Sequence, residues 1–193
     1  MTSETFRIER FDTPTGRMQL VSDEQGRVHA LDWADHDARM QRLLGRYYRN
    51  VTLTLRDTEE ESAARRALLA YFDGQLAAVE GVPVASSGTV FQNEVWAGLR
   101  RIPRGQTLSY GALAKDIGRP AAVRAVGLAN GSNPIAIIVP CHRVIGADAS
   151  LTGFGGGLER KRWLLDHEQR GDRDPATHLA ARPRSRATRS VQP

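Results

Sequence analysis

The segment from residue 133 to residue 144, Asn-Pro-Ile-Ala-Ile-Ile-Val-Pro-Cys-His-Arg-Val, places the chain's one cysteine, Cys141, at the end of an apolar run. His142 and Arg143 follow it directly. Neighbouring cations and an imidazole favour the thiolate over the thiol, which a nucleophilic cysteine requires. A cysteine without such neighbours is more often a small core residue. The basic neighbours therefore favour a reactive Cys141, with a core role as the alternative.

Two short helices are predicted before this segment. Residues 110–117 form the first, which Thr107 or Ser109 can cap and which Gly118 closes. The second is expected over residues 120–131, with Pro120 at its first position, where the missing N–H costs nothing. Helix, short glycine turn and helix together predict a helix-turn-helix, although two packed helices of any function can show the same pattern.

The second of these helices has an unusual composition for a reader of DNA sequence. Residues 121–127, Ala-Ala-Val-Arg-Ala-Val-Gly, offer small side chains and one arginine, Arg124. Such a face can approach a nucleic-acid backbone closely while recognising little sequence, which favours docking in the minor groove through phosphates and shape. Tight packing against another helix is the alternative.

The composition of residues 81–88, Gly-Val-Pro-Val-Ala-Ser-Ser-Gly, is that of a linker. We therefore predict a supporting domain over residues 1–80 and a second domain over residues 89–171. The second domain opens with a helix that ends before Pro103. Residues 172–193 contain five arginines and almost no large apolar side chains, which predicts a disordered basic tail.

The first domain is expected to combine strands and helices. Hydrophobic patterns predict a three-stranded meander, one further strand and two helices. These elements are expected over residues 6–9, 18–22 and 27–33 for the meander, 40–47 and 64–72 for the helices, and 51–55 for the fourth strand. His29 and His36 have no cysteine nearby and are expected to lie at the surface, so we predict no metal site.

Bulk properties separate the two halves by charge. The net charge is −3 over residues 1–86, +5 over residues 87–171 and +3 over residues 172–193. Basic charge around Cys141 fits a polyanionic partner, and it also fits an ordinary solvated surface. The sequence has neither a membrane-spanning run nor a signal sequence, and a single cysteine excludes an internal disulfide. We expect a soluble, cytoplasmic protein.

Several separate motifs carry a family resemblance. Pro-Cys-His-Arg-Val at residues 140–144 resembles the active-site signature of the O6-alkylguanine-DNA alkyltransferases, also called methylated-DNA–protein-cysteine methyltransferases. Residues 109–114 and 124–127 resemble the DNA-binding segment of that family, and residues 153–158 and 163–168 resemble its pocket loop and closing helix. The resemblance is strong from about residue 91 to residue 168 and is closest to the constitutive bacterial type.

The resemblance implies a fold and a reaction. The fold is α/β (α+β), with a small ribonuclease H-like mixed sheet followed by a mainly helical domain that contains a winged helix-turn-helix. The reaction is direct-reversal repair, in which one alkyl group moves irreversibly from O6-alkylguanine, or O4-alkylthymine, to the protein's own cysteine. Double-stranded DNA is the implied partner, no cofactor or membrane is involved, and a monomer that can bind DNA cooperatively is expected.

The resemblance also assigns catalytic and DNA-binding roles. Cys141 is the nucleophile, His142 its base through a water molecule, and Glu168 the group that orients and stabilises the imidazole. Asn133 fixes the turn before the strand that carries the cysteine. Tyr110 crowds the phosphate beside the flipped nucleotide and protonates guanine N3. The residues assigned to DNA are Arg124, which fills the gap left in the base stack, together with Tyr110, Ala122, Ala125 and Gly127.

Phe154, Gly155, Gly156 and Val144 are the residues that the resemblance assigns to the substrate pocket. Phe154 stands where tyrosine is frequent, and Gly155 stands where some members have serine. We therefore expect a wider pocket that lacks one side-chain hydrogen bond to O6. Val123 replaces a common alanine on the DNA-facing helix.

Two other classes of function remain. A Cys-His-Glu hydrolase would use the same three residue types, but it would have no use for a helix-turn-helix that carries Arg124. A protein that binds the lesion without repairing it would lack the cysteine.

Overall fold

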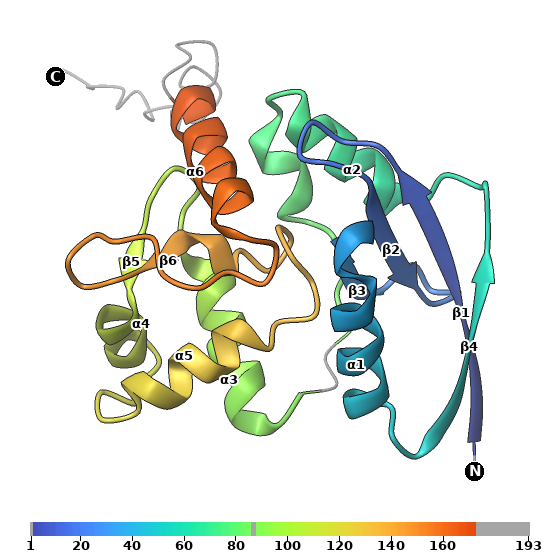
Figure 1. Cartoon of the computed structure of the whole chain (residues 1–193), viewed down its shortest axis with the longest axis horizontal. Coiled ribbons are helices and arrows are strands. Elements are labelled where there is room, and N and C mark those ends of the chain that lie inside the picture. Colours follow the sequence, from blue (N-terminus) through green and yellow to red (C-terminus); the bar gives the residue numbers. More distant parts are fainter. Residues whose placement is uncertain (1, 86–87, 173–193) are drawn as a thin grey trace, which may run out of the picture.

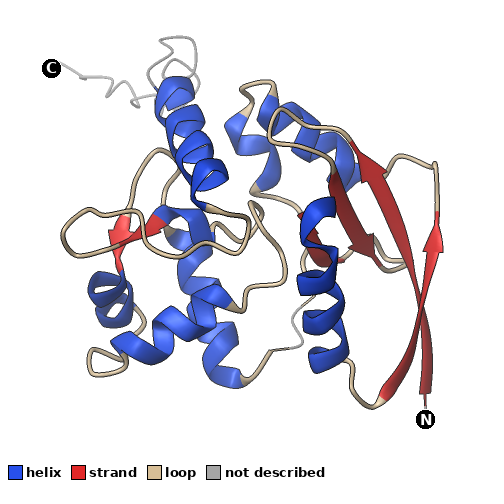
Figure 2. Cartoon of the chain, viewed as in Figure 1, coloured by secondary structure: helices blue, strands red, loops and turns tan. Residues whose placement is uncertain are grey.

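The computed structural model describes residues 2–85 and 88–172, in which a sheet with two helices precedes a mainly helical half (Figures 1 and 2). The four strands are β1 (Thr2–Phe11), β2 (Met18–Ser22), β3 (Val28–Trp33) and β4 (Val51–Asp57). Their order is β3-β2-β1-β4, with β1 antiparallel to β2, β2 antiparallel to β3, and β1 parallel to β4. The predicted meander and the mixed sheet are confirmed.

The two edge strands of the sheet, β3 and β4, differ in burial, since isolated bridges to Val84 and Ile135 cover the outer side of β3. The edge strand β4 alternates between half-buried and exposed residues, whereas every residue of β2 and β3 is buried. Helix α1 (Asp37–Tyr47) buries Met40 and Leu44 with Phe6 and Ile8 on one face of the sheet. Helix α2 (Ala63–Phe72) packs with the opposite face, in the cluster that also contains side chains of the second half.

The second half begins with α3 (Val90–Arg101), whose Thr89 and Gln92 form a capping box. The helix-turn-helix consists of α4 (Tyr110–Asp116), which Ser109 caps as predicted, and α5 (Val123–Gly131). A short parallel pair, β5 (Leu108–Ser109) with β6 (Val144–Ile145), flanks it, and α6 (Leu158–Asp172) closes the structure. Short 3-10 helices are η1 (Ala34–His36), η2 (Leu76–Val79) and η3 (Cys141–Arg143).

The predicted start of the second helix at Pro120 is wrong. The N–H of Ala122 donates to the carbonyl of Arg119 at 2.9 Å, which makes residues 119–122 a β-turn with Pro120 at its second position, and α5 begins only at Val123. Proline's fixed φ suits that turn position as well as a helix start. Ala122 therefore lies at the helix end and not on its face.

The predicted strand before Cys141 is also wrong. Only Ile135 pairs like a strand residue, with Leu31 of β3. The chain then turns, with Ile137 at φ 66° and the N–H of Val139 donating to the carbonyl of Ile135 at 3.1 Å, and Cys141 starts η3. The run is apolar because it passes through the core, where a buried turn and a buried strand leave the same apolar signature.

One hydrophobic cluster runs through both halves and includes Leu20, Trp33 and Leu68 from the first and Val95 and Leu164 from the second. The division into two domains joined by residues 81–88 remains a prediction. Helix α6 extends to Asp172, the first residue of the predicted tail; residues 173–193 lie outside the described residues, as do residues 86–87 of the linker. In the described part of the chain, no helix has the length and apolarity needed to span a membrane.

Candidate active site

Cys141 lies at the first position of η3, with 6% of its surface exposed. Its N–H donates to the carbonyl of Val139 at 2.8 Å. Burial raises the pKa of the thiol, although a hydrogen bond with Asn133 and the positive charges of Arg39 and Lys161 oppose this rise. The resting side chain is therefore a thiol at neutral pH, and it needs a base before it can act as a nucleophile.

The turn that leads to Cys141 is held by the side chain of Asn133. Its amide group donates to the carbonyls of Ile135 and Val139 at 3.2 and 2.8 Å, and its oxygen accepts from the N–H of Ile135 at 3.0 Å. Asn133 is 1% exposed, so these bonds are shielded from water. The Asn133 side chain thus bonds across the turn that leads into η3, and the functional role assigned to it remains a prediction.

His142 and Glu168 form a fully buried pair, with 2.9 Å between Nε2 and Oε1. Burial lowers the pKa of His142, although the charge of Glu168 and the hydrogen bond with it oppose this. The imidazole is therefore neutral at pH 7. Since an ionised carboxylate only accepts, Nε2 carries the proton and Nδ1 has a free lone pair. Among the described residues, Nδ1 of His142 has no hydrogen-bond partner.

Glu168 is the centre of the buried network. Besides His142, Arg143 donates to both of its oxygens, at 2.9 Å from Nε and 2.8 Å from Nη2. The hydroxyl of Tyr71 donates at 2.9 Å and the N–H of Gly105 at 3.1 Å. Burial alone would raise the pKa of Glu168, but the charges and hydrogen bonds of His142 and Arg143 outweigh it and hold that pKa far below its ordinary value. Glu168 therefore stays ionised at neutral pH.

Tyr71 was missed at the level of sequence, because it occupies an ordinary position on the apolar face of α2. Burial, together with the charge of Glu168, raises the pKa of the Tyr71 hydroxyl well above its ordinary value, so this hydroxyl remains a donor. Its polar group on an apolar helix face was the only available signal.

Lys161 was also missed at the level of sequence, although its positive charge acts directly on the pKa of Cys141. Its side chain is completely buried, and Nζ donates to the carbonyls of Val144 and Thr152 at 2.6 and 2.7 Å. Burial lowers its pKa, and the nearby Cys141 opposes that shift. Lys161 and Glu168 are seven residues apart and so share one face of α6. Two charged residues in an otherwise apolar register were the signal that could have revealed it.

Arg39 of α1 joins the first half to the turn before Cys141. It donates to Asp32 at 2.5 Å and to the carbonyls of Gly131 and Asn133 at 3.1 and 3.0 Å. A side-chain carbon at Gly155 would lie 2.5 Å from its guanidinium carbon. The expectation that Gly155 leaves a wider pocket is therefore wrong on that side, because Arg39 occupies the space.

The predicted pocket residues lie around this assembly. The Phe154 ring packs edge-on against Trp33 and His142, with centroids 5.8 and 6.5 Å apart. Gly156 must be glycine because any side chain there would run into the Trp33 ring. The side chain of Val144 is fully buried, and its backbone contributes the carbonyl that holds Lys161. The Phe154 side chain is therefore half-buried, whereas the Val144 side chain is fully buried.

The predicted DNA-binding residues lie on α5 and beside it. Arg124 and Ala125 are exposed, whereas Ala122, Gly127 and Tyr110 are half-buried. Arg124 makes no ion pair with any described residue. A side chain at Gly127 would contact the Tyr110 ring at 3.8 Å, so Tyr110 packs beside the small-residue face. The Tyr110 hydroxyl accepts a bond from Thr152 at 3.4 Å, which connects it to the loop before Phe154.

Fold and site together define a class of protein in which a buried cysteine, followed by a histidine that pairs with a carboxylate, is combined with a helix-turn-helix. Comparisons with known proteins agree. Residues 90–170 match the family described as "6-O-methylguanine DNA methyltransferase, DNA binding domain". The chain is 47% identical over 160 residues to the methylated-DNA–protein-cysteine methyltransferase of Shigella flexneri, covering 83% of this chain and 94% of that protein.

Solved structures give the same answer. The O6-methylguanine methyltransferase of Mycobacterium tuberculosis superposes with a TM-score of 0.72 at 39% identity, covering 90% of this chain and 99% of that one. A structure of the M. tuberculosis protein in complex with DNA superposes with a TM-score of 0.64 at 38% identity, covering 86% and 94%. The chain belongs to the methylated-DNA–protein-cysteine methyltransferase family.

Proposed function

We propose that this protein repairs DNA by direct reversal, moving an alkyl group from O6 of guanine to Sγ of Cys141. The observation that carries the proposal is the neutral, buried His142, whose Nε2 is held by Glu168 and whose Nδ1 is unbonded among the described residues. The lowered pKa keeps the His142 imidazole in the neutral form that can accept a proton, and the raised pKa keeps the Cys141 thiol protonated until a base removes its proton.

The transfer is a single displacement at the alkyl carbon. His142 takes the thiol proton through a water molecule, and the imidazolium that forms is stabilised by the ionised Glu168. The sulfur electron pair then forms the S–C bond while the C–O6 bond breaks, and that bonding pair leaves with guanine. Tyr110 donates a proton to guanine N3, so that guanine departs neutral. Arg143 and Tyr71 hold Glu168 in place throughout.

The target atom must leave the duplex to reach Cys141. Since O6 lies inside the base stack, we assign α5 to the minor groove, with Ala122, Ala125 and Gly127 allowing close approach and Arg124 filling the vacated position. Extrusion costs a few kcal/mol, and less where alkylation has weakened base pairing. The lesion thereby contributes to its own selection.

The extruded base would meet the loop that carries Phe154, Gly155 and Gly156. The half-buried Phe154 ring supplies a wall for the base, and the loop backbone supplies N–H groups for its edge. Because Cys141 is 6% exposed, the alkyl group reaches the sulfur through a narrow opening, which excludes bulk water from the reaction.

Four finer properties are inferred from the family. We place the protein with the constitutive bacterial members, in the cytoplasm, where a reducing environment keeps its single cysteine as a thiol. We expect a monomer that can bind DNA cooperatively. O4-alkylthymine is the expected second substrate.

One experiment tests the proposed function. The protein is mixed with a duplex that contains one O6-methylguanine, and the tryptic peptide with Cys141 is examined by mass spectrometry. We expect one methyl group per protein molecule on that peptide and none in Cys141→Ala, because a thioether has no group that water can displace. Continued turnover beyond one methyl group per molecule would instead support a hydrolase.

A further inference from the structure

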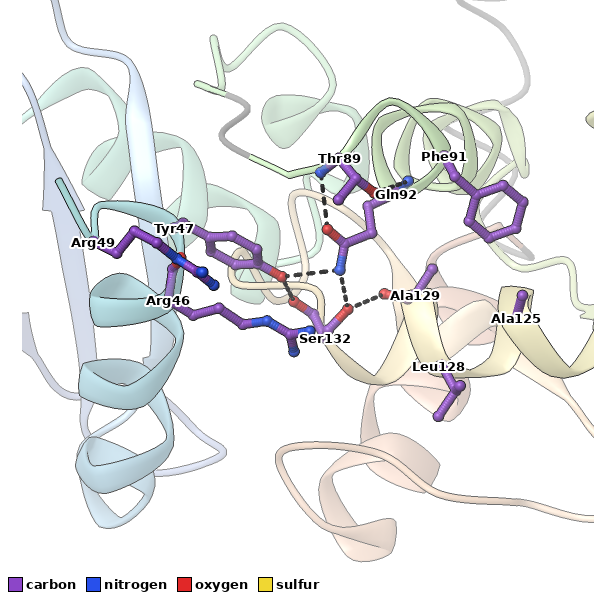
Figure 3. A pocket seen from close by; sticks show the side chains of 10 residues that line it. All are labelled: Arg46, Tyr47, Arg49, Thr89, Phe91, Gln92, Ala125, Leu128, Ala129 and Ser132. Carbon is purple, nitrogen blue, oxygen red and sulfur yellow. Dashed lines mark hydrogen bonds between the residues drawn. The ribbon is translucent and has the colours of Figure 1, made fainter.

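A groove of about 510 Å³ separates α1 of the first half from α3 and α5 of the second (Figure 3). One wall is formed by α1 and the residues that follow it, and the other by the exposed side of α5. The groove does not include any residue of the Cys141 network. Its lining residues are Arg46, Tyr47, Arg49, Thr89, Phe91, Gln92, Ala125, Leu128, Ala129 and Ser132.

The charge of the groove is positive and unopposed. Arg46 and Arg49 line it, and no lining residue is acidic. Neither arginine forms an ion pair with any residue that the structure describes, and the one bond of either side chain is from Nε of Arg49 to the carbonyl of Arg46, at 3.3 Å. Two exposed guanidinium groups without carboxylate partners fit an anionic ligand, since Arg matches phosphate oxygens with paired N–H groups.

The wall that carries these arginines is fixed relative to α5. The Tyr47 hydroxyl donates to the carbonyl of Ser132 at 2.8 Å, and Nε2 of Gln92 donates to the Ser132 hydroxyl at 2.9 Å. Figure 3 shows Arg46 reaching from α1 toward Ser132 at the end of α5. Arg46 is also two helical turns from Arg39, whose guanidinium bonds Gly131 at the same junction. The arginines are therefore held beside α5 and not on a separate moving body.

The opposite wall of the groove, formed by α5, indicates which kind of ligand the groove binds. Ala125 lines the groove and is the exposed neighbour of Arg124, and Leu128 follows one turn later with 72% of its surface exposed. A helix in the minor groove has one DNA strand on each side, because that groove is only about 6 Å wide. If the Ala125 face of α5 docks there, the strand on the α1 side passes over the groove and brings its phosphates to Arg46 and Arg49.

We propose that Arg46 and Arg49 bind the sugar–phosphate backbone of one DNA strand alongside α5, so that the first half of the chain is part of the DNA interface. This inference rests on the proposed function, because it takes α5 as the helix that enters DNA. The contacts position the duplex without reading its sequence, and so they act on damaged and undamaged DNA alike.

The test compares two double variants with the same loss of charge. Arg46→Gln with Arg49→Gln removes the proposed contacts. The control, Arg56→Gln with Arg66→Gln, removes two exposed arginines of β4 and α2, elements that do not line the groove. Binding of an undamaged duplex is measured by fluorescence anisotropy over a range of salt concentrations, and transfer from free O6-methylguanine base is measured in parallel.

We expect the groove variant to bind about 10-fold more weakly, with a dependence of log affinity on log salt that is flatter by about 1.8, or about 0.9 for each lost phosphate contact. The control should keep the wild-type slope, and both should react with the free base at the wild-type rate. An unchanged slope, or an equal change in the control, overturns the inference. A loss of cooperativity at constant slope also overturns it, because the groove would then hold a second copy of the chain. If the slope falls as expected while the wild type transfers no alkyl group, the DNA contact stands and the proposed function fails.

Discussion

Two buried histidine–carboxylate pairs in the described part of the chain have nearly equal geometry but differ in what the histidine can do. His29 and Asp23 in the first half have 2.9 Å between Nε2 and Oδ2, the same separation as His142 and Glu168 in the second half. The second ring nitrogen of His29 bonds the Tyr48 hydroxyl, and the ring stacks on Phe6. His29 is thus saturated and buried, contrary to its predicted place at the surface.

His142 differs in its unbonded nitrogen and in what surrounds its carboxylate. Nδ1 has no partner in the part of the chain that the structure describes, and Arg143 and Tyr71 add further donors to Glu168. Asp23, in contrast, shares its charge with Arg27, whose side chain is 54% exposed. A histidine with both nitrogens satisfied stabilises a fold, whereas one with a free lone pair is able to accept a proton, and His142 directly follows Cys141 in the sequence.

The largest expected effect is a difference in alkyl-transfer rate between variants of the two histidines. His142→Gln removes the base, and general base catalysis contributes about 100- to 10,000-fold, so alkyl transfer from duplex DNA should slow by that range. His29→Gln should leave the single-turnover rate within about 2-fold of the wild type, because its pair has no access to Cys141. Rapid-quench transfer assays measure both. Equal slowing in the two variants would show that the unbonded Nδ1 of His142 does not give it a role in the reaction that His29 lacks.

A second expected effect concerns stability. Glu168→Gln leaves the guanidinium of Arg143 buried without a counter-charge, which should lower the free energy of unfolding by about 3 to 5 kcal/mol. Asp23→Asn should cost only about 1 to 3 kcal/mol, since the Arg27 side chain can turn to water. Urea unfolding followed by circular dichroism gives both values. A larger loss in Asp23→Asn would show that Glu168 is not the centre of the stronger network.

The smallest effect is a dependence of rate on pH. His142 works as a base only when neutral, and burial holds its pKa below the ordinary 6.5. The proton therefore binds only below that value, so the transfer rate should be nearly flat from pH 8 to 6.5 and fall toward 10-fold per pH unit in more acid solution. Rates on a short duplex at constant ionic strength measure this. A midpoint above pH 6.5 would mean that Glu168 raises the His142 pKa more than burial lowers it.

Local patterns predicted the elements that local forces decide. The alternation of strand residues, the Ser109 cap and the glycine turn at Gly118 depend on neighbours within a few positions, and the structure has them where expected. Pro120 was misplaced because two local conformations suit its fixed φ. The apolar run before Cys141 was misassigned because apolarity reports burial and not backbone shape.

The candidate site was predictable only in part for a related reason. Cys141, His142 and Glu168 were found through motifs that the resemblance supplied, and no periodicity in the chain pairs residues 142 and 168. Arg39 and Tyr71 come from elements 94 and 97 residues away from the atoms that they bond. Contacts over such separations depend on which faces meet in the folded chain, and each residue by itself fits its helix without any sign of the site.

The protonation state of the His142 ring at pH 7 decides whether this side chain can take the proton of Cys141. Nitrogen NMR of protein labelled with ¹⁵N-histidine distinguishes the two neutral tautomers from the cation, with His142→Gln used to assign the signals. We expect a neutral ring with a proton on Nε2 and a lone pair on Nδ1, and protonation only below pH 6.5. A cationic ring at pH 7, or a proton on Nδ1, would contradict it, because neither form can take the proton of Cys141 through that nitrogen.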